Sequence, residues 1–319
     1  MTEPSHGDNA FTATSLYGRQ PEMTYGGALS FLRRRYTKDL AGTDVVVSGI
    51  PFDAATSFRP GARLGPQAIR AASVQHAELF AFPWGFDPFQ RLAVIDWGDC
   101  FVDYGYPQRL VETVEAHARH ILASGATMLT FGGDHFVTYP LLRAHAALHG
   151  PLALVHFDAH PDTWPDDGER LDHGTMFRRA AEQGLIDPRR SVQIGIRTHA
   201  RNDLGFTVLD APWVHEHGPR AVVEEVRRVV GDARAYLSFD IDCLDPAFAP
   251  GTGTPVPGGL SSAQALAIVR GLGEVNWVGL DLVEVSPPFD HAEVTALAAA
   301  TLAHDFLCLL AARRPKRSA

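Results

Sequence analysis

The chain has 319 residues, of which 45% are hydrophobic and 20% are charged, and it carries a formal net charge of −9. This composition is typical of a globular protein with a sizeable core, and the acidic balance argues against a nucleic-acid-binding surface and suits small cationic ligands. The three cysteines are widely spaced and odd in number, which excludes a disulfide framework or a clustered zinc site and fits a reducing cytoplasm.

The first 30 residues have the composition of an irregular arm, without the basic start and apolar run of a secretory signal. Beyond them, apolar runs predict strands at residues 44–50, 92–99, 127–133, 152–158, 191–197, 235–242 and 277–285. Amphipathic segments predict helices at residues 108–124, 219–231 and 261–272. Because strands alternate with helices and no linker or repeat divides the chain, we expect one α/β domain over residues 1–319, with a mainly parallel sheet covered on both faces.

Two further segments have helical patterns. GARLGPQAIRAAS, residues 61–73, contains a Gly-Pro pair followed by a helical pattern, which is a reasonable helix start. The segment is either a plain connection after a strand, or a structured loop near the functional site or a subunit contact. TALAAATLAHDFLCLLAA, residues 295–312, is strongly apolar but contains His304 and Asp305. We therefore expect a buried terminal helix and no membrane association.

Ionisable side chains follow three of the predicted strands, in GGDH, in HFDAHPD and in DID. Each set alone could be a polar strand end or a cap. The carboxyl ends of parallel strands meet at one edge of a sheet, however, so the three sets can converge on one ligand. The six candidate side chains are His135, Asp158, His160, Asp162, Asp240 and Asp242.

The charges of these six residues predict a pair of metal ions. Four carboxylates contribute −4 and two neutral imidazoles contribute nothing, so two divalent cations restore neutrality; a bridging hydroxide then leaves −1 for a cationic substrate to match. Oxygen and imidazole ligands without a thiolate favour Mn²⁺ over Mg²⁺, Co²⁺ or Zn²⁺. Nearby, we expect Asp134 to orient hydrogen bonds around the site, and His156 and Cys243 to be packed core residues.

The order of long motifs resembles that of the ureohydrolases, the arginase and agmatinase family, and of bacterial agmatinases in particular. The matching segments are GIPFD (49–53), GARLGPQAIR (61–70), GGDH, HFDAHPD, DHGTMF (172–177), SFDIDCLDPAFAPGTGTPVPGGL (238–260) and GLDLVEVSPP (279–288). The resemblance implies a three-layer α/β/α arginase/deacetylase-like fold with an eight-stranded sheet, two Mn²⁺ per subunit and a homotrimer or homohexamer.

The resemblance also implies roles for single residues. The six candidates above match the family's metal ligands, and Asp162 would in addition orient the attacking hydroxide. His173 matches the residue that relays a proton to the leaving amine, and Glu284 matches the carboxylate that binds the substrate guanidinium, with His173 beside it. Pro161 departs from the family pattern, which more often has Thr at this position. Because proline lacks a backbone N–H, the hydrogen bonds that support the metal ligands are expected to differ here.

The substrate expected from this resemblance is agmatine, cleaved to putrescine and urea. The loop WPDDGERL, residues 164–171, is placed to reach the far end of the substrate, and its Asp166, Asp167 and Glu169 suit the ammonium group of agmatine. A solvated acidic loop is the alternative, and 4-guanidinobutyrate and arginine remain alternative substrates. A one-zinc deacetylase relative and a non-catalytic metal-binding regulator are further alternatives; six intact ligands argue against the first, and His173 argues against the second.

Overall fold

A computed structural model describes residues 7–18, 22–77, 79–201 and 204–315. The nine strands formed by these residues lie in one parallel sheet, in the order β1-β3-β2-β4-β9-β8-β5-β6-β7. The strands are β1 (Arg35–Tyr36), β2 (Val45–Gly49), β3 (Val94–Asp99), β4 (Thr127–Phe131), β5 (Ala153–Phe157), β6 (Val192–Ile194), β7 (Thr207–Leu209), β8 (Arg234–Asp240) and β9 (Asn276–Val283).

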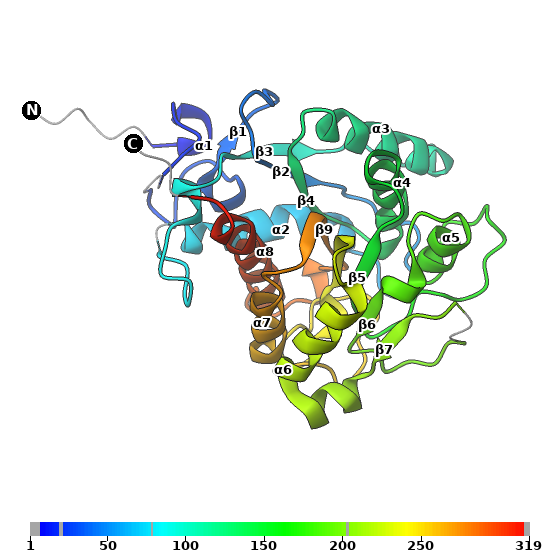
Figure 1. Cartoon of the computed structure of the whole chain (residues 1–319). Helices are drawn as coiled ribbons and strands as arrows, with labels where there is room; N and C mark the ends of the chain where they lie inside the picture. Colours follow the sequence, from blue (N-terminus) through cyan, green and yellow to red (C-terminus); the bar gives the residue numbers. More distant parts are fainter. Residues whose placement is uncertain (1–6, 19–21, 78, 202–203, 316–319) are drawn as a thin grey trace, which may run out of the picture.

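Helices cover both faces of this sheet (Figure 1). One layer contains α3 (Leu110–Leu122), α4 (Thr138–His149) and α5 (Met176–Glu182). The other contains α2 (Gly65–Ser73), α6 (Ala211–Val230), α7 (Ser262–Gly271) and α8 (Val294–Ala312). The prediction of a three-layer α/β/α fold is confirmed, but the described residues form nine strands rather than the expected eight, and the two edge strands, β1 and β7, have only two and three residues.

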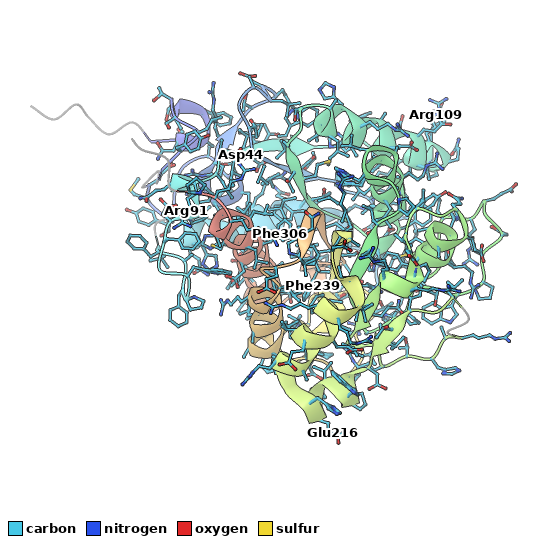
Figure 2. All side chains as sticks on the ribbon, viewed as in Figure 1. Asp44, Arg91, Arg109, Glu216, Phe239 and Phe306 are labelled. Atoms are coloured by element: carbon cyan, nitrogen blue, oxygen red, sulfur yellow. The ribbon has the colours of Figure 1, made fainter. Side chains whose placement is uncertain are left out.

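Alternation along the strands divides the core into two halves. In β2, Val45 and Val47 face the α2, α6, α7 and α8 layer, while Val46 faces the layer of α3, α4 and α5. Both faces are covered by helices, so every residue of β2 is buried and the sequence reads as a continuous apolar run. Figure 2 shows the same contrast between inside and outside, with Phe239 in the interior and Glu216 at the periphery.

Local sequence signals explain where several helices begin. Ser261 accepts a hydrogen bond from the backbone N–H of Gln264, whose side chain accepts one in return, and this capping box starts α7 where a helix was predicted. Helix α6 consists of two helical segments: Asp210 caps the first, and a kink at Gly218, with non-helical φ 77° and ψ 170°, separates it from the second. The second segment follows this kink at Pro219, so the helix predicted from residue 219 is confirmed.

The predicted terminal helix is α8, the one helix among the described residues that is long and apolar enough to cross a membrane. Of its most apolar window, 72% is buried inside the structure, so packing against the sheet accounts for its composition. His304 and Asp305 are buried too, and Asp305 accepts hydrogen bonds from the side chains of Trp84 and Arg270 at 2.8 and 2.7 Å.

The segment at residues 61–73 forms a short 3₁₀ turn followed by α2, so it is a connection between a strand and a helix. It also lies close to the end of β9: a Cβ atom at Gly65 would stand 2.5 Å from the carbonyl oxygen of Val285. In the N-terminal arm, the described residues up to Ser30 include one short helix, α1 (Asn9–Thr12).

Candidate metal centre and cleft

Four neighbouring strands in the middle of the sheet, β4, β9, β8 and β5, carry the candidate residues at or just beyond their carboxyl ends. His135 follows β4, Glu284 follows β9, Asp240 ends β8, and Asp158 follows β5. Segments far apart in the sequence therefore meet at one edge, as parallel strand pairing requires. The structure brings all six candidate ligands together there.

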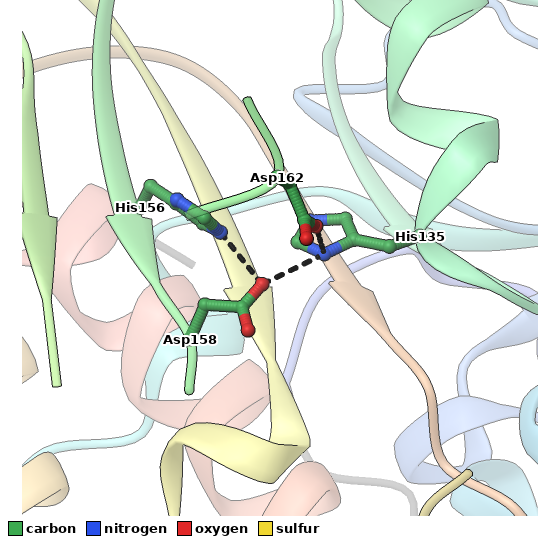
Figure 3. Close-up of side chains that lie close together, drawn as sticks. All are labelled: His135, His156, Asp158 and Asp162. Atoms are coloured by element: carbon green, nitrogen blue, oxygen red, sulfur yellow. Dashed lines mark hydrogen bonds and ion pairs between the residues drawn. The ribbon is translucent and has the colours of Figure 1, made fainter. Parts of the chain in front are cut away.

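The first group of ligands surrounds the ring of His135. Its Nδ1 atom lies 3.0 Å from Asp158 Oδ2, 3.0 Å from Asp162 Oδ2 and 3.2 Å from Asp240 Oδ2. None of these contacts has hydrogen-bond geometry, and within the described residues the buried Nδ1 has no hydrogen-bond partner. The Nδ1 atom and three carboxylate oxygens thus point at one another, as Figure 3 shows for Asp158 and Asp162.

The second group surrounds His160, whose Nδ1 atom lies 3.0 Å from Asp242 Oδ2 and 3.2 Å from Asp158 Oδ1. Asp158 therefore directs Oδ2 into the first group and Oδ1 into the second. A carboxylate shared in this way is suited to bridging two cations.

The electrostatics of the cluster favour bound cations. Burial, together with repulsion from Asp242 and Asp158, raises the pKa of Asp240 well above its usual value. Burial and the charge of Asp158 likewise raise the pKa of Asp162 to about 7. Carboxylates this crowded and buried need protons or metal ions between them, and oxygen with imidazole nitrogen is a donor set that divalent ions such as Mn²⁺ accept. The residues present fit a two-metal site.

Glu284 and His173 form a pair beside the metal-suited cluster. Glu284 Oε1 lies 2.8 Å from His173 Nδ1 and accepts a hydrogen bond of 2.8 Å from the backbone N–H of His135. Burial favours a neutral imidazole, but the carboxylate of Glu284 outweighs burial and raises the pKa of His173 to about 9. Glu284 Oε2 is buried and has no partner within the described part of the chain, so it is free to accept a hydrogen bond from a ligand.

The backbone is strained where these acids are presented. Asp162 and Glu284 adopt φ values of 50° and 63°, a left-handed conformation that costs energy for residues other than glycine. The turn before His135 is equally constrained, because a Cβ atom at Gly133 would lie 1.7 Å from the carbonyl oxygen of Phe52. Asp134 holds the loop after β2 in place, because its side chain accepts a hydrogen bond of 2.8 Å from the backbone N–H of Ala55.

His156 is fully buried, as the sequence predicts for a packed core histidine, and it also contacts a proposed metal ligand directly. Its Nε2 atom lies 2.7 Å from Asp158 Oδ2 (Figure 3), and its Nδ1 atom lies 3.1 Å from Gln193 Nε2. Since the amide nitrogen of Gln193 only donates, His156 accepts at Nδ1 and donates from Nε2 to Asp158. Gln193 also donates to the carbonyl oxygen of Pro161 at 2.7 Å, a bond that proline at this position preserves.

Two other positioning residues left no recognisable sequence signal. Ser238 places its Oγ 2.8 Å from His135 Nε2 and donates to Asp281 Oδ1 at 2.7 Å, so the ring of His135 is held from behind. The backbone N–H of Arg197 donates to the carbonyl oxygen of Ala159 at 2.9 Å. Arg197 thereby connects the turn after β5 with the turn after β8. Its guanidinium donates hydrogen bonds to the carbonyl oxygens of Gly195, Asp242, Cys243, Leu244 and Val256.

A cleft of about 250 Å³ opens beside the cluster. His160, Asp162, His173 and Asp240 line its metal-facing part. The remaining lining residues are Ser57, Trp164, Pro165, Asp172, Gly174, Thr175 and Thr254. The cleft is therefore largely polar, and of the described residues that line it none is a lysine or an arginine.

The acidic loop is arranged differently from the sequence interpretation. Asp166 turns inward and forms an ion pair with Arg179, in which both side chains are almost fully buried. Asp167 is exposed and accepts the backbone N–H groups of Glu169 and Arg170, each at 2.9 Å. The three acids proposed to reach the substrate thus do not line the cleft; Asp172, just beyond the loop, does.

Comparisons with known proteins agree with this geometry. A family model described as the arginase family matches residues 43–309. The chain is 60% identical over 310 residues to an agmatinase of Chromobacterium violaceum, covering 97% of this chain and 96% of that protein. The crystal structure of a hypothetical agmatinase from Burkholderia thailandensis is 63% identical, with a TM-score of 0.95, covering 96% of this chain and 98% of that one. Proclavaminate amidino hydrolase from Streptomyces clavuligerus is 40% identical, with a TM-score of 0.84, covering 91% of this chain and 99% of that one.

Proposed function

The chain belongs to the arginase family and is a ureohydrolase, and on this premise we propose that it hydrolyses agmatine to putrescine and urea with two Mn²⁺ per subunit. One observation carries the proposal: Asp158 divides its oxygens between two metal-suited groups, and the pair of His173 and Glu284 lies directly beside them. The agmatinases among the relatives, at 60% identity and below, support the choice of agmatine.

The proposed ligands of the two ions are the six side chains grouped around His135 and His160. Bound divalent ions would lower the pKa of a water molecule and so supply a nucleophile at neutral pH. Asp162 lines the cleft and would orient that nucleophile. Ser238 and His156 would keep the ligands in place from behind, by the hydrogen bonds described above.

The substrate guanidinium would pair with Glu284 through Oε2, the buried oxygen that lacks a partner among the described residues. This pairing would hold the central carbon of the guanidinium next to the nucleophile. Such positioning would promote the attack, because a delocalised cation is a poor electrophile. After attack, the bond between this carbon and the alkyl-bearing nitrogen breaks, and the leaving amine takes up a proton. His173 would deliver it, since it lines the cleft and its pKa, raised to about 9 beside Glu284, favours the protonated imidazole at neutral pH.

Urea release tests the proposal. Protein stripped of metal and reloaded with Mn²⁺ is given agmatine, arginine or 4-guanidinobutyrate at equal concentration, and urea is measured while bound metal is counted. We expect two Mn²⁺ per chain and the highest kcat/KM with agmatine. Faster urea release from arginine or 4-guanidinobutyrate would identify that compound as the substrate in place of agmatine. Absence of urea with all three compounds would refute the proposed hydrolase activity. From the same resemblance we propose a homotrimer or homohexamer, to be measured by sedimentation.

A further inference from the structure

The residues that line the cleft become more exposed with distance from the metal cluster, so the two ends of a bound substrate would lie in different surroundings. Asp162 and Asp240, at the metal cluster, are buried; Trp164 and Asp172 are half-buried; Pro165 is exposed. A guanidinium held at the buried end would leave the other end of an extended molecule beside the half-buried pair. This placement rests on the function proposed above.

Trp164 and Asp172 are held next to each other by the backbone. The N–H of Trp164 donates to the carbonyl oxygen of Gly174 at 3.1 Å, which joins the entry and the exit of the acidic loop. A Cβ atom at Gly174 would lie 3.0 Å from Cε3 of Trp164, so the indole packs directly against the glycine. The position of the indole on the cleft wall is therefore fixed by packing and by a hydrogen bond.

One carboxylate oxygen of Asp172 is held by the backbone, and the other forms an exposed ion pair. Oδ1 accepts the backbone N–H of Gly174 at 2.9 Å. Oδ2 lies 3.3 Å from the guanidinium of Arg170, a side chain that is 72% exposed. An ion pair with so exposed a partner contributes little, so a cation arriving in the cleft can replace Arg170 at Oδ2.

We propose that Trp164 and Asp172 are the specificity-determining residues for the distal end of the substrate, and that they select a primary ammonium group. The face of an indole attracts a cation through its quadrupole, and the adjacent carboxylate adds a charge-assisted hydrogen bond. A substrate ending in a carboxylate meets repulsion from Asp172 instead, and none of the described lining residues is a lysine or an arginine that could offset it.

The test compares agmatine with butylguanidine, which has the same chain length but no distal charge. In Asp172→Asn we expect KM for agmatine to rise about tenfold with little change in kcat, because the amide keeps the hydrogen bond from Gly174 but loses the charge. Trp164→Leu should cause a similar loss, and Trp164→Phe should restore part of it. The kcat/KM for butylguanidine should stay within about twofold in all three variants, because a neutral tail uses neither group.

Asp167→Asn is the matched control, since it removes a charge from the same loop without touching the cleft; it should leave both substrates unaffected. Equal losses for agmatine and butylguanidine would overturn the proposal and leave the two residues a purely structural role. A faster wild-type reaction with 4-guanidinobutyrate than with agmatine would also overturn it, in favour of Arg170 as a carboxylate partner. If butylguanidine turns over too slowly, its inhibition constant against agmatine makes the same comparison. Failure of the wild type to release urea from any guanidine would instead refute the proposed function.

Discussion

Removing the hydroxyl of Ser238 should weaken metal binding without touching a single proposed ligand. Ser238 donates to Asp281, so its lone pair accepts from Nε2–H of His135. That bond leaves the lone pair of His135 on Nδ1, facing the carboxylates of the cluster. In Ser238→Ala the imidazole loses both its preferred tautomer and its orientation, and the buried oxygen of Asp281 loses its donor.

Ser238→Ala should lower both the stability of the metal-free protein and its affinity for metal. A buried group left without its partner costs about 1–3 kcal/mol, so the metal-free variant should unfold at lower denaturant concentration. Loss of a residue that holds a metal-binding histidine typically lowers metal affinity about 10–100-fold. Calorimetric titration of metal-free protein with Mn²⁺ measures the second effect directly.

Ser48→Ala controls for a purely structural effect. Ser48 is equally buried, and its Oγ is bonded to the ring of His117 at 2.7 Å and to the carbonyl oxygen of Gly98 at 3.0 Å, none of which belongs to the cluster. It should lose comparable stability and bind Mn²⁺ like the wild type. Unchanged Mn²⁺ affinity in Ser238→Ala, or an equal loss of affinity in Ser48→Ala, would refute the reasoning.

His173→Ala should keep both metal ions but lower the turnover of agmatine by about 10²-fold or more, because the leaving amine loses its acid; undiminished turnover would rule out the proton-relay role. Asp242→Ala should lose one or both ions by elemental analysis, and an intact two-metal stoichiometry would contradict its assignment as a ligand. Asp166→Asn should be less stable than the wild type at neutral pH, with turnover retained. Burial alone would raise the pKa of Asp166, but its hydrogen bonds with Arg179 outweigh burial and hold it below the usual value. The stabilisation is therefore present at neutral pH and is lost as the pH falls through that lowered pKa, so the difference in urea-unfolding midpoints should shrink below about pH 4; a constant difference would show that the charge pair is not its source.

The amino-acid sequence determined the architecture because the signals for it are local. All seven predicted strands are present within a few residues of their expected bounds, since a strand buried on both faces is a short, continuous apolar run. The strands it missed, β1 and β7 (Thr207–Leu209), are two and three residues long at the sheet edges, too short to form such a run. The six candidate ligands were also visible, because charged residues at the ends of apolar strands stand out in any α/β sequence.

Only the tertiary structure decided how these residues are used. The sequence left open which strands are neighbours, and the order β4-β9-β8-β5 is what brings His135 to Asp158 and Asp242 to His160. It also gave no sign that Arg197 joins two turns through backbone carbonyls, or that Asp166 turns inward while Asp172 reaches the cleft. Strand and helix formation depends on neighbours within a few residues, whereas these contacts join residues farther apart along the chain, so no periodicity in the sequence could reveal them.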